Sequence, residues 1–165
     1  MVEPVRSFLI RKFEEIERRM LLVLDQLNED QLHWRPNDAS NSAANLIVHI
    51  CGNIDERILG GIRRQPVSRD RDREFMPVSL TKPELAELLR GKFAELIETV
   101  NAMDDEAWGE KQIVRGKQRT YADVLLQCAA HFSEHLGQVL YIGKMCVNDR
   151  YVTTSIPRRE RADEV

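Results

Sequence analysis

Two histidines that lie four residues apart carry the clearest chemical signal in this chain. His131 and His135 lie in residues 129–138, where the spacing of apolar side chains predicts a helix. Side chains at positions i and i+4 stack on one face of a helix, so both imidazoles can point at one partner. That face is largely apolar, and burying two imidazoles there is costly unless each ring finds a partner. A divalent cation uses both rings at once, although two core histidines with other partners would give the same spacing.

A catalytic metal site normally takes three protein ligands and leaves one position open. The chain has two further histidines, His33 and His49. His33 lies beside Trp34 in a predicted loop, which favours a surface or packing role. At about 100° per residue, His49 points about 160° away from Ile47, the middle of the apolar stripe of its helix. The helical pattern alone therefore predicts an exposed His49, unless the polar side of this helix lines a wet cleft.

Polar neighbours of these histidines can orient a bound group or act as a base. Gln138 lies one turn after His135 on the same face, where it can orient a metal-bound water or accept a ring N–H. Cys128 precedes His131 by three residues, and we interpret it as a core thiol. Three residues share the predicted side of His49: Asn45, Asn53 and Glu56.

Four helical patterns position these residues. They cover residues 3–27, 41–62, 81–103 and 120–147, with apolar side chains at three- and four-residue steps. No strand series is evident. A charged connection, residues 63–80, is longer than an antiparallel hairpin needs, so we expect it to travel the length of the bundle. The sequence therefore predicts an all-α four-helix bundle with a long crossover between the second and third helices.

Capping residues mark where the predicted helices begin. Ser40 or Asn41 is expected to cap the second helix, and Thr81 with Glu84 forms a capping box for the third. Thr120 is expected to open the fourth. The first helix contains an apolar stretch, residues 20–24, which is either deeply buried or shared with a second subunit. We expect one domain over residues 1–157 and a polar C-terminal tail at 158–165.

Composition narrows the class of protein. The formal net charge is −3, and acidic residues interrupt the basic cluster at 69–73, so we expect a solvated loop there and no nucleic-acid partner. No apolar run approaches the ~20 residues that span a bilayer, and residues 1–4 lack the features of a signal peptide. The three cysteines are scattered, which is typical of reduced thiols. We therefore expect a cytoplasmic protein without a membrane partner.

These motifs together resemble the DinB/YfiT-like superfamily. The resemblance rests on a lone histidine after residues 45–48 and on the motif His131-x-x-x-His135-x-Gly137-Gln138 in the last helix. The segments 137–144 and 155–158 look like those of one subfamily of DinB-like metalloenzymes. The resemblance covers nearly the whole chain.

The resemblance implies an up-down-down-up four-helix bundle that is often a dimer. It also implies a divalent metal held by His49, His131 and His135 near one end of the bundle. This expectation overrides the exposed position that the helical pattern gives His49. Members of the superfamily include thiol-dependent enzymes, among them maleylpyruvate isomerases that use mycothiol and transferases that use bacillithiol.

We therefore expect a metal-dependent enzyme that acts on a small molecule, by transfer of a bacillithiol- or mycothiol-type thiol or by hydrolysis. Zinc held by three imidazoles can lower the pKa of a bound water toward ~7 or hold a thiol as its thiolate. Three histidines do not select the metal; we expect zinc or nickel, with manganese and iron as alternatives.

Two other hypotheses stay open at this point. One is a non-catalytic, metal-binding, dimeric helical bundle that acts as a binding or structural module. The other is a dimeric helical protein with satisfied core histidines and no metal. An open coordination position beside a cavity would favour the enzyme, whereas a fourth protein ligand would favour a structural metal site.

Overall fold

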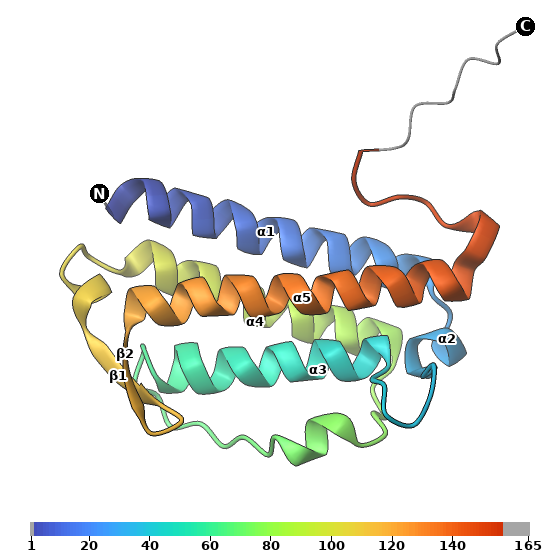
Figure 1. Ribbon diagram of the computed structural model, residues 1–165, viewed down its shortest axis with the longest axis horizontal. Coiled ribbons are helices and arrows are strands. Elements are labelled where there is room, and N and C mark those ends of the chain that lie inside the picture. Colours follow the sequence, from blue (N-terminus) through green and yellow to red (C-terminus); the bar gives the residue numbers. More distant parts are fainter. Residues whose placement is uncertain (1, 157–165) are drawn as a thin grey trace, which may run out of the picture.

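Four long helices dominate the computed structural model, which describes residues 2–156 (Figure 1). They are α1 (Val2–Gln26), α3 (Ala43–Ile54), α4 (Lys82–Ala102) and α5 (Tyr121–Val147). The shorter elements are α2 (Glu29–His33), the π-helix η1 (Asp55–Gly60), the 3-10 helices η2 (Asp72–Phe75), η3 (Ala107–Gly109) and η4 (Asn148–Arg150), and the strands β1 (Lys111–Val114) and β2 (Lys117–Thr120). The predicted helical class is confirmed, apart from this small two-stranded sheet. The single domain stays a prediction, and the predicted tail at 158–165 lies outside the described residues.

The long helices lie side by side, with α3 and α4 running opposite to α1 and α5 (Figure 1). Helix α1 packs against α4 and α5, and α3 packs against the same two helices. The connection between η1 and α4 passes along α3, where η2 contacts that helix. None of the described helices combines the length and hydrophobicity that crossing a bilayer requires.

An aromatic contact between three helices fixes the rotation of α5. The buried ring of Phe132 lies 6.2 Å from the ring of Phe13 on α1 and 6.0 Å from that of Phe93 on α4. Successive residues of a helix point about 100° apart. Because Phe132 faces the core, its neighbour His131 is turned toward α3.

The second long helix begins and ends differently from the prediction. Its N-cap is Ser42, whose hydroxyl accepts a hydrogen bond from the Asn45 backbone N–H, so the predicted caps Ser40 and Asn41 are wrong. The α-helical hydrogen bonds stop at Ile54, and the wider π-helical turn η1 replaces the predicted continuation to residue 62. The other long helices match the predicted spans to within one or two residues.

The structure contains a β-hairpin and a short helix that the sequence pattern does not predict. Strands β1 and β2 pair antiparallel around Arg115 and Gly116, whose φ angles of 50° and 75° form the turn. Positive φ at both central residues matches the right-handed twist of a hairpin. The strands are short and contain no buried residue, so they lack the apolar alternation by which a strand is predicted. Helix α2 lies in the predicted loop 28–40, where Asn28 and Gln31 form its capping box.

Removing the cap of α5 should destabilise the fold modestly. The Thr120 hydroxyl accepts a hydrogen bond of 3.1 Å from the Asp123 backbone N–H. Thr120→Ala is expected to lower the free energy of unfolding by about 1 kcal/mol in urea titrations, because that amide loses its partner. Thr153→Ala, at an exposed threonine outside the helices, is the control and should change little. Equal effects of both substitutions would contradict the capping role.

Candidate metal centre

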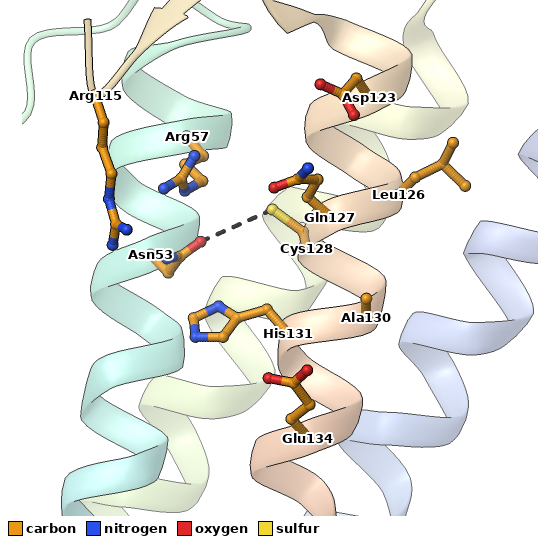
Figure 2. A pocket seen from close by; sticks show the side chains of 10 residues that line it. All are labelled: Asn53, Arg57, Arg115, Asp123, Leu126, Gln127, Cys128, Ala130, His131 and Glu134. Carbon is orange, nitrogen blue, oxygen red and sulfur yellow. Dashed lines mark hydrogen bonds between the residues drawn. The ribbon is translucent and has the colours of Figure 1, made fainter. Parts of the chain in front are cut away.

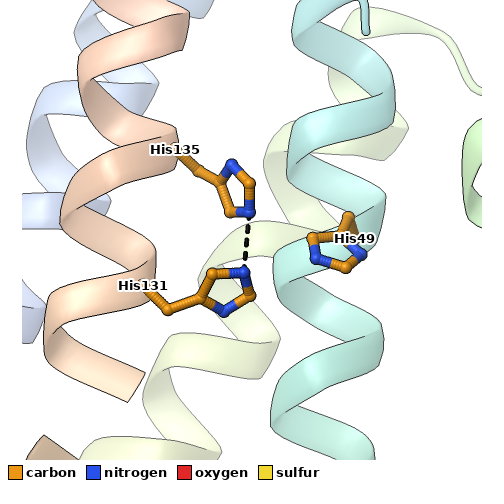
Figure 3. Close-up of side chains that lie close together, drawn as sticks. All are labelled: His49, His131 and His135. Carbon is orange, nitrogen blue, oxygen red and sulfur yellow. Dashed lines mark hydrogen bonds between the residues drawn. The ribbon is translucent and has the colours of Figure 1, made fainter. Parts of the chain in front are cut away.

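Three histidines from two helices converge on one point. Their candidate ligand atoms all lie within 4.8 Å of one another. The Nε2 atoms of His131 and His135 are 2.8 Å apart, and the His49 ring centroid lies 5.3 Å and 5.1 Å from those two rings (Figure 3). The fold therefore brings together all three histidines that the resemblance named. The group can hold a metal ion.

The exposed position that the helical pattern gave His49 is wrong. Only 5% of this residue is exposed. The polar side of α3 faces α5 and is covered by η2, so Asn45 and Asn53 on that side are buried as well. The helical pattern predicts an exposed His49 only if one face of α3 is buried, whereas α3 is buried on nearly every side.

A buried carboxylate holds the ring of His49. Glu74 Oε2 lies 2.7 Å from His49 Nδ1, and both side chains are buried. The Arg69 guanidinium donates to both Glu74 oxygens, at 2.6 Å and 2.9 Å, and also pairs with Glu56. An ionised carboxylate only accepts hydrogen bonds, so it places the imidazole proton on Nδ1 and leaves Nε2 free as a ligand.

An amide holds the ring of His135 in a similar way. Gln138 Oε1 lies 2.8 Å from His135 Nδ1, one turn along α5. Because this oxygen accepts the Nδ1 proton, His135 Nε2 is free on the side of His131. This contact confirms the expected role of Gln138 as the acceptor of a histidine ring N–H. Three imidazoles, two of them with Nδ1 fixed by an acceptor, fit a divalent cation.

Burial favours the neutral form of His49 and His131, which is the form that binds metals. Desolvation lowers the pKa of His49, against the opposing effect of Glu74. Burial, together with the positive charges that His135 and His49 would carry, lowers the pKa of His131 to about 4. Neutral imidazoles do not have to lose protons before a cation binds at neutral pH.

Other candidates from the sequence have mainly supporting roles. The Asn45 amide donates to the backbone carbonyls of Glu74 and Met76, at 2.8 Å and 2.7 Å, and so fixes η2 against α3. The Cys128 thiol is buried and donates to Asn53 Oδ1 at 3.8 Å. Burial raises the pKa of Cys128 to about 12, which agrees with a core thiol. His33 lies on α2 and is not part of the three-histidine group.

The solvated loop expected around residues 69–73 is wrong at Arg69 and at its partner Glu74. Both side chains are almost completely buried, at 6% and 9% exposure, because the crossover folds back onto α3. One signal could have indicated this packing. Gly52 lies inside a helix, where glycine is unfavourable, and a Cβ there would collide with the Glu74 carboxylate.

Two cavities open beside the histidine group. One, of about 580 Å3, is lined by His131 and lies between the end of α3 and the start of α5 (Figure 2). The other, of about 740 Å3, is lined by Gln138 and by Tyr141 of α5. Glu134 borders both cavities, although the sequence pattern does not single it out as a candidate site residue. Within residues 2–156, no fourth His, Cys, Asp or Glu joins the three histidines.

Comparison with known protein families shows to which family this chain belongs. Residues 5–160 match the family described as "Protein of unknown function (DUF1572)". The chain belongs to the DUF1572 family. No curated protein matches this DUF1572 chain.

Solved structures share the fold of the DUF1572 chain. A conserved protein from Enterococcus faecalis has a TM-score of 0.74 at 13% identity, covering 87% of this chain and 97% of its own. A DinB-like protein from Bacillus cereus ATCC 10987 has a TM-score of 0.68 at 17% identity, covering 83% and 89%. These similarities establish a DinB-like fold, in agreement with the DinB/YfiT-like resemblance.

The metal-free protein should lose stability as the pH falls from neutral toward 4. The pKa of His131 is lowered from 6.5 to about 4 in the folded state, and that of His49 is lowered as well. Between these values the unfolded chain binds more protons than the folded chain, so the free energy of unfolding falls with falling pH. Urea titrations in EDTA at several pH values across this window measure the effect.

The variant His131→Gln checks that this histidine causes the pH dependence. It should flatten the dependence, because the group with the shifted pKa is gone. Lys12 holds the pKa of Glu15, and the Thr81 backbone holds that of Glu84, below the usual 4.5, so these carboxyls titrate below most of the window. An unchanged slope in His131→Gln would contradict the assignment.

Proposed function

We propose that this protein is a metal-dependent enzyme that acts on a small molecule, with His49, His131 and His135 as the ligands of one divalent cation. One observation carries the proposal: the ligand atoms of three imidazoles lie within 4.8 Å of one another beside a cavity, and no fourth ligand among residues 2–156 closes the group. A structural metal site would be closed by such a ligand. The arrangement of α1, α3, α4 and α5 is consistent with the up-down-down-up four-helix bundle that we infer for the scaffold.

The residues around the three histidines would have different roles in such a metal site. When bound, a divalent cation supplies Lewis-acid chemistry, which makes a water or a thiol more acidic. Glu74 and Gln138 fix the Nδ1 protons of His49 and His135 and so orient both rings. Glu134 is exposed and borders both cavities, so its carboxylate is accessible to a small molecule bound in either. We therefore assign proton transfer to Glu134.

We propose transfer of a low-molecular-weight thiol, of the bacillithiol or mycothiol type, as the reaction, with hydrolysis as the alternative chemistry at the same site. Neither reaction needs a protein nucleophile, in agreement with the buried Cys128. We propose zinc or nickel as the metal, with manganese or iron as alternatives, although three imidazoles alone do not select among them.

Turnover of a model electrophile tests the reaction. The protein is loaded with zinc or nickel and mixed with an electrophile and bacillithiol, mycothiol or glutathione. A rate that depends on both metal and thiol is expected, and EDTA should abolish it. Hydrolysis of model esters and amides without thiol would favour the alternative reaction. A protein that holds one metal per chain but accelerates neither reaction would instead be a non-catalytic metal-binding module.

We also propose that the protein is a cytoplasmic homodimer. Within the described part of the chain, α5 exposes three large apolar side chains, Leu126, Tyr141 and Met145. The apolar stretch 20–24 contributes less, because Leu22 is its one exposed member. The cysteines are free, which agrees with a reducing compartment. A mass measurement in solution tests the dimer, and a monomer at all concentrations would exclude it.

A further inference from the structure

Two arginines without an acidic partner border the cavity next to His131. Arg57 comes from η1 and is half-buried, and Arg115 comes from the turn of the hairpin. Within residues 2–156, no carboxylate forms an ion pair with either guanidinium, whereas Asp123 in the same cavity pairs with Arg119 at 3.1 Å. Figure 2 shows both arginines across the cavity from Gln127 and His131 of α5.

Two backbone irregularities bring these arginines to the same cavity. The α-helical winding of α3 gives way to the π-helix η1, and Arg57 lies within this turn. Arg115 adopts a φ of 50°, a conformation that is costly for a residue other than glycine or asparagine. Gln112 of β1 donates to the Arg57 carbonyl at 3.1 Å and so ties the hairpin to η1. π-turns and strained residues often occur at functional sites.

The positive charges at one end of this cavity are not balanced by carboxylates, which favours the binding of an anion there. Four charged groups border it: Arg57, Arg115, Asp123 and Glu134. Asp123 is neutralised by Arg119, and Glu134 lies at the far end, beyond His131, in Figure 2. The end between η1 and the hairpin therefore carries two unpaired positive charges and the neutral amides of Asn53 and Gln127.

We propose that Arg57 and Arg115 bind an oxyanion, a carboxylate or a phosphate, on the small molecule whose reacting atom lies at the three histidines. The planar guanidinium matches both groups with paired hydrogen bonds. The cavity of about 580 Å3 accommodates a small molecule whose two ends contact the arginines and His131. The inference rests on the proposed function for the reaction, but anion binding itself does not need the metal.

Calorimetric titration of the metal-free protein tests this site, because without metal an anion cannot bind to the cation instead. The full chain is freed of metal with EDTA, then freed of EDTA by dialysis, and titrated with succinate, with inorganic phosphate and with neutral succinamide. We expect at least one anion to bind and succinamide not to bind. Arg57→Gln and Arg115→Gln should each weaken binding by about tenfold or more, since each removes a charged hydrogen-bond donor. The anion that binds more tightly shows whether the site prefers a carboxylate or a phosphate on the small molecule.

A charge-matched control distinguishes anion binding by these two arginines from a general attraction of the anion to the net charge of the protein. The double variant Arg18→Gln/Lys117→Gln changes the net charge as much as Arg57→Gln/Arg115→Gln does. Lys117 belongs to the same hairpin, yet neither control residue borders the cavity. Unchanged affinity in the control double variant supports the site. Equal weakening in both double variants, or no anion binding by the unaltered protein, would overturn it.

Metal content distinguishes failure of this inference from failure of the proposed function. If the Arg57→Gln/Arg115→Gln variant keeps its metal and the anion affinity of the unaltered protein, the inference fails and the metal site stands. If the unaltered protein binds the anion through these arginines but never retains metal, the proposed function fails and the anion site stands.

Discussion

His135→Ala should abolish metal retention while the helices stay intact. The substitution removes one of the three nitrogens that converge within 4.8 Å. Loss of a direct ligand should weaken binding by more than the ~10–100-fold typical of residues that only support a ligand. His135 is only half-buried, so the free energy of unfolding of the metal-free protein should change by about 1 kcal/mol or less. Elemental analysis and far-ultraviolet circular dichroism measure the two quantities.

His33→Ala is the matched control for this experiment. It removes a half-buried histidine that lies outside the metal-binding group, so metal content should stay at one per chain. If His135→Ala unfolds the protein, the ring is chiefly a packing residue. If both variants keep their metal, the cation binds elsewhere and the three histidines are not its ligands.

Glu74→Gln should destabilise the protein strongly and also weaken metal binding. The substitution removes the buried counter-ion of the Arg69 guanidinium, which is only 9% exposed, and leaves it paired with the more exposed Glu56. Breaking a buried ion pair from one side costs about 3–5 kcal/mol in the free energy of unfolding. His49 also loses the charged acceptor of its Nδ1 proton, so metal affinity should fall by about 10–100-fold. Asp72→Asn, at an exposed acid of the same η2 turn, is the control.

A double substitution separates the two roles of Glu74. Arg69→Met/Glu74→Leu replaces the buried pair by apolar side chains of similar size, which often restores stability. Metal affinity should stay low, because His49 Nδ1 still lacks an acceptor. Recovery of both stability and metal affinity would show that the carboxylate does not orient the histidine.

The sequence predicts the parts of the site that depend on local periodicity. The spacing of His131 and His135 places both on one face of α5, and the capping residues Thr81 and Thr120 mark two helix starts correctly. These features depend on neighbours within one or two turns, which a single sequence contains.

The parts that failed depend on contacts between distant segments. His49 looked exposed because only one face of its helix is apolar, yet ten of the twelve residues of α3 are buried by other elements. Glu74 and Arg69 looked solvated because their burial comes from packing of the crossover on α3. The position of η2 cannot be obtained from helical spacing, since it depends on hydrogen bonds from Asn45 to residues some thirty positions away.

The contact of Phe132 with Phe13 and Phe93 constrains how this protein can change in length. The three rings lock the rotation of α5, and His131 follows from that rotation. One amino acid inserted between Phe132 and His135 would turn His135 by about 100° away from its partners while the helix remained a helix. An insertion in this stretch of α5 would therefore separate the three histidines, whereas one in a surface turn would leave the spacing of His131 and His135 unchanged.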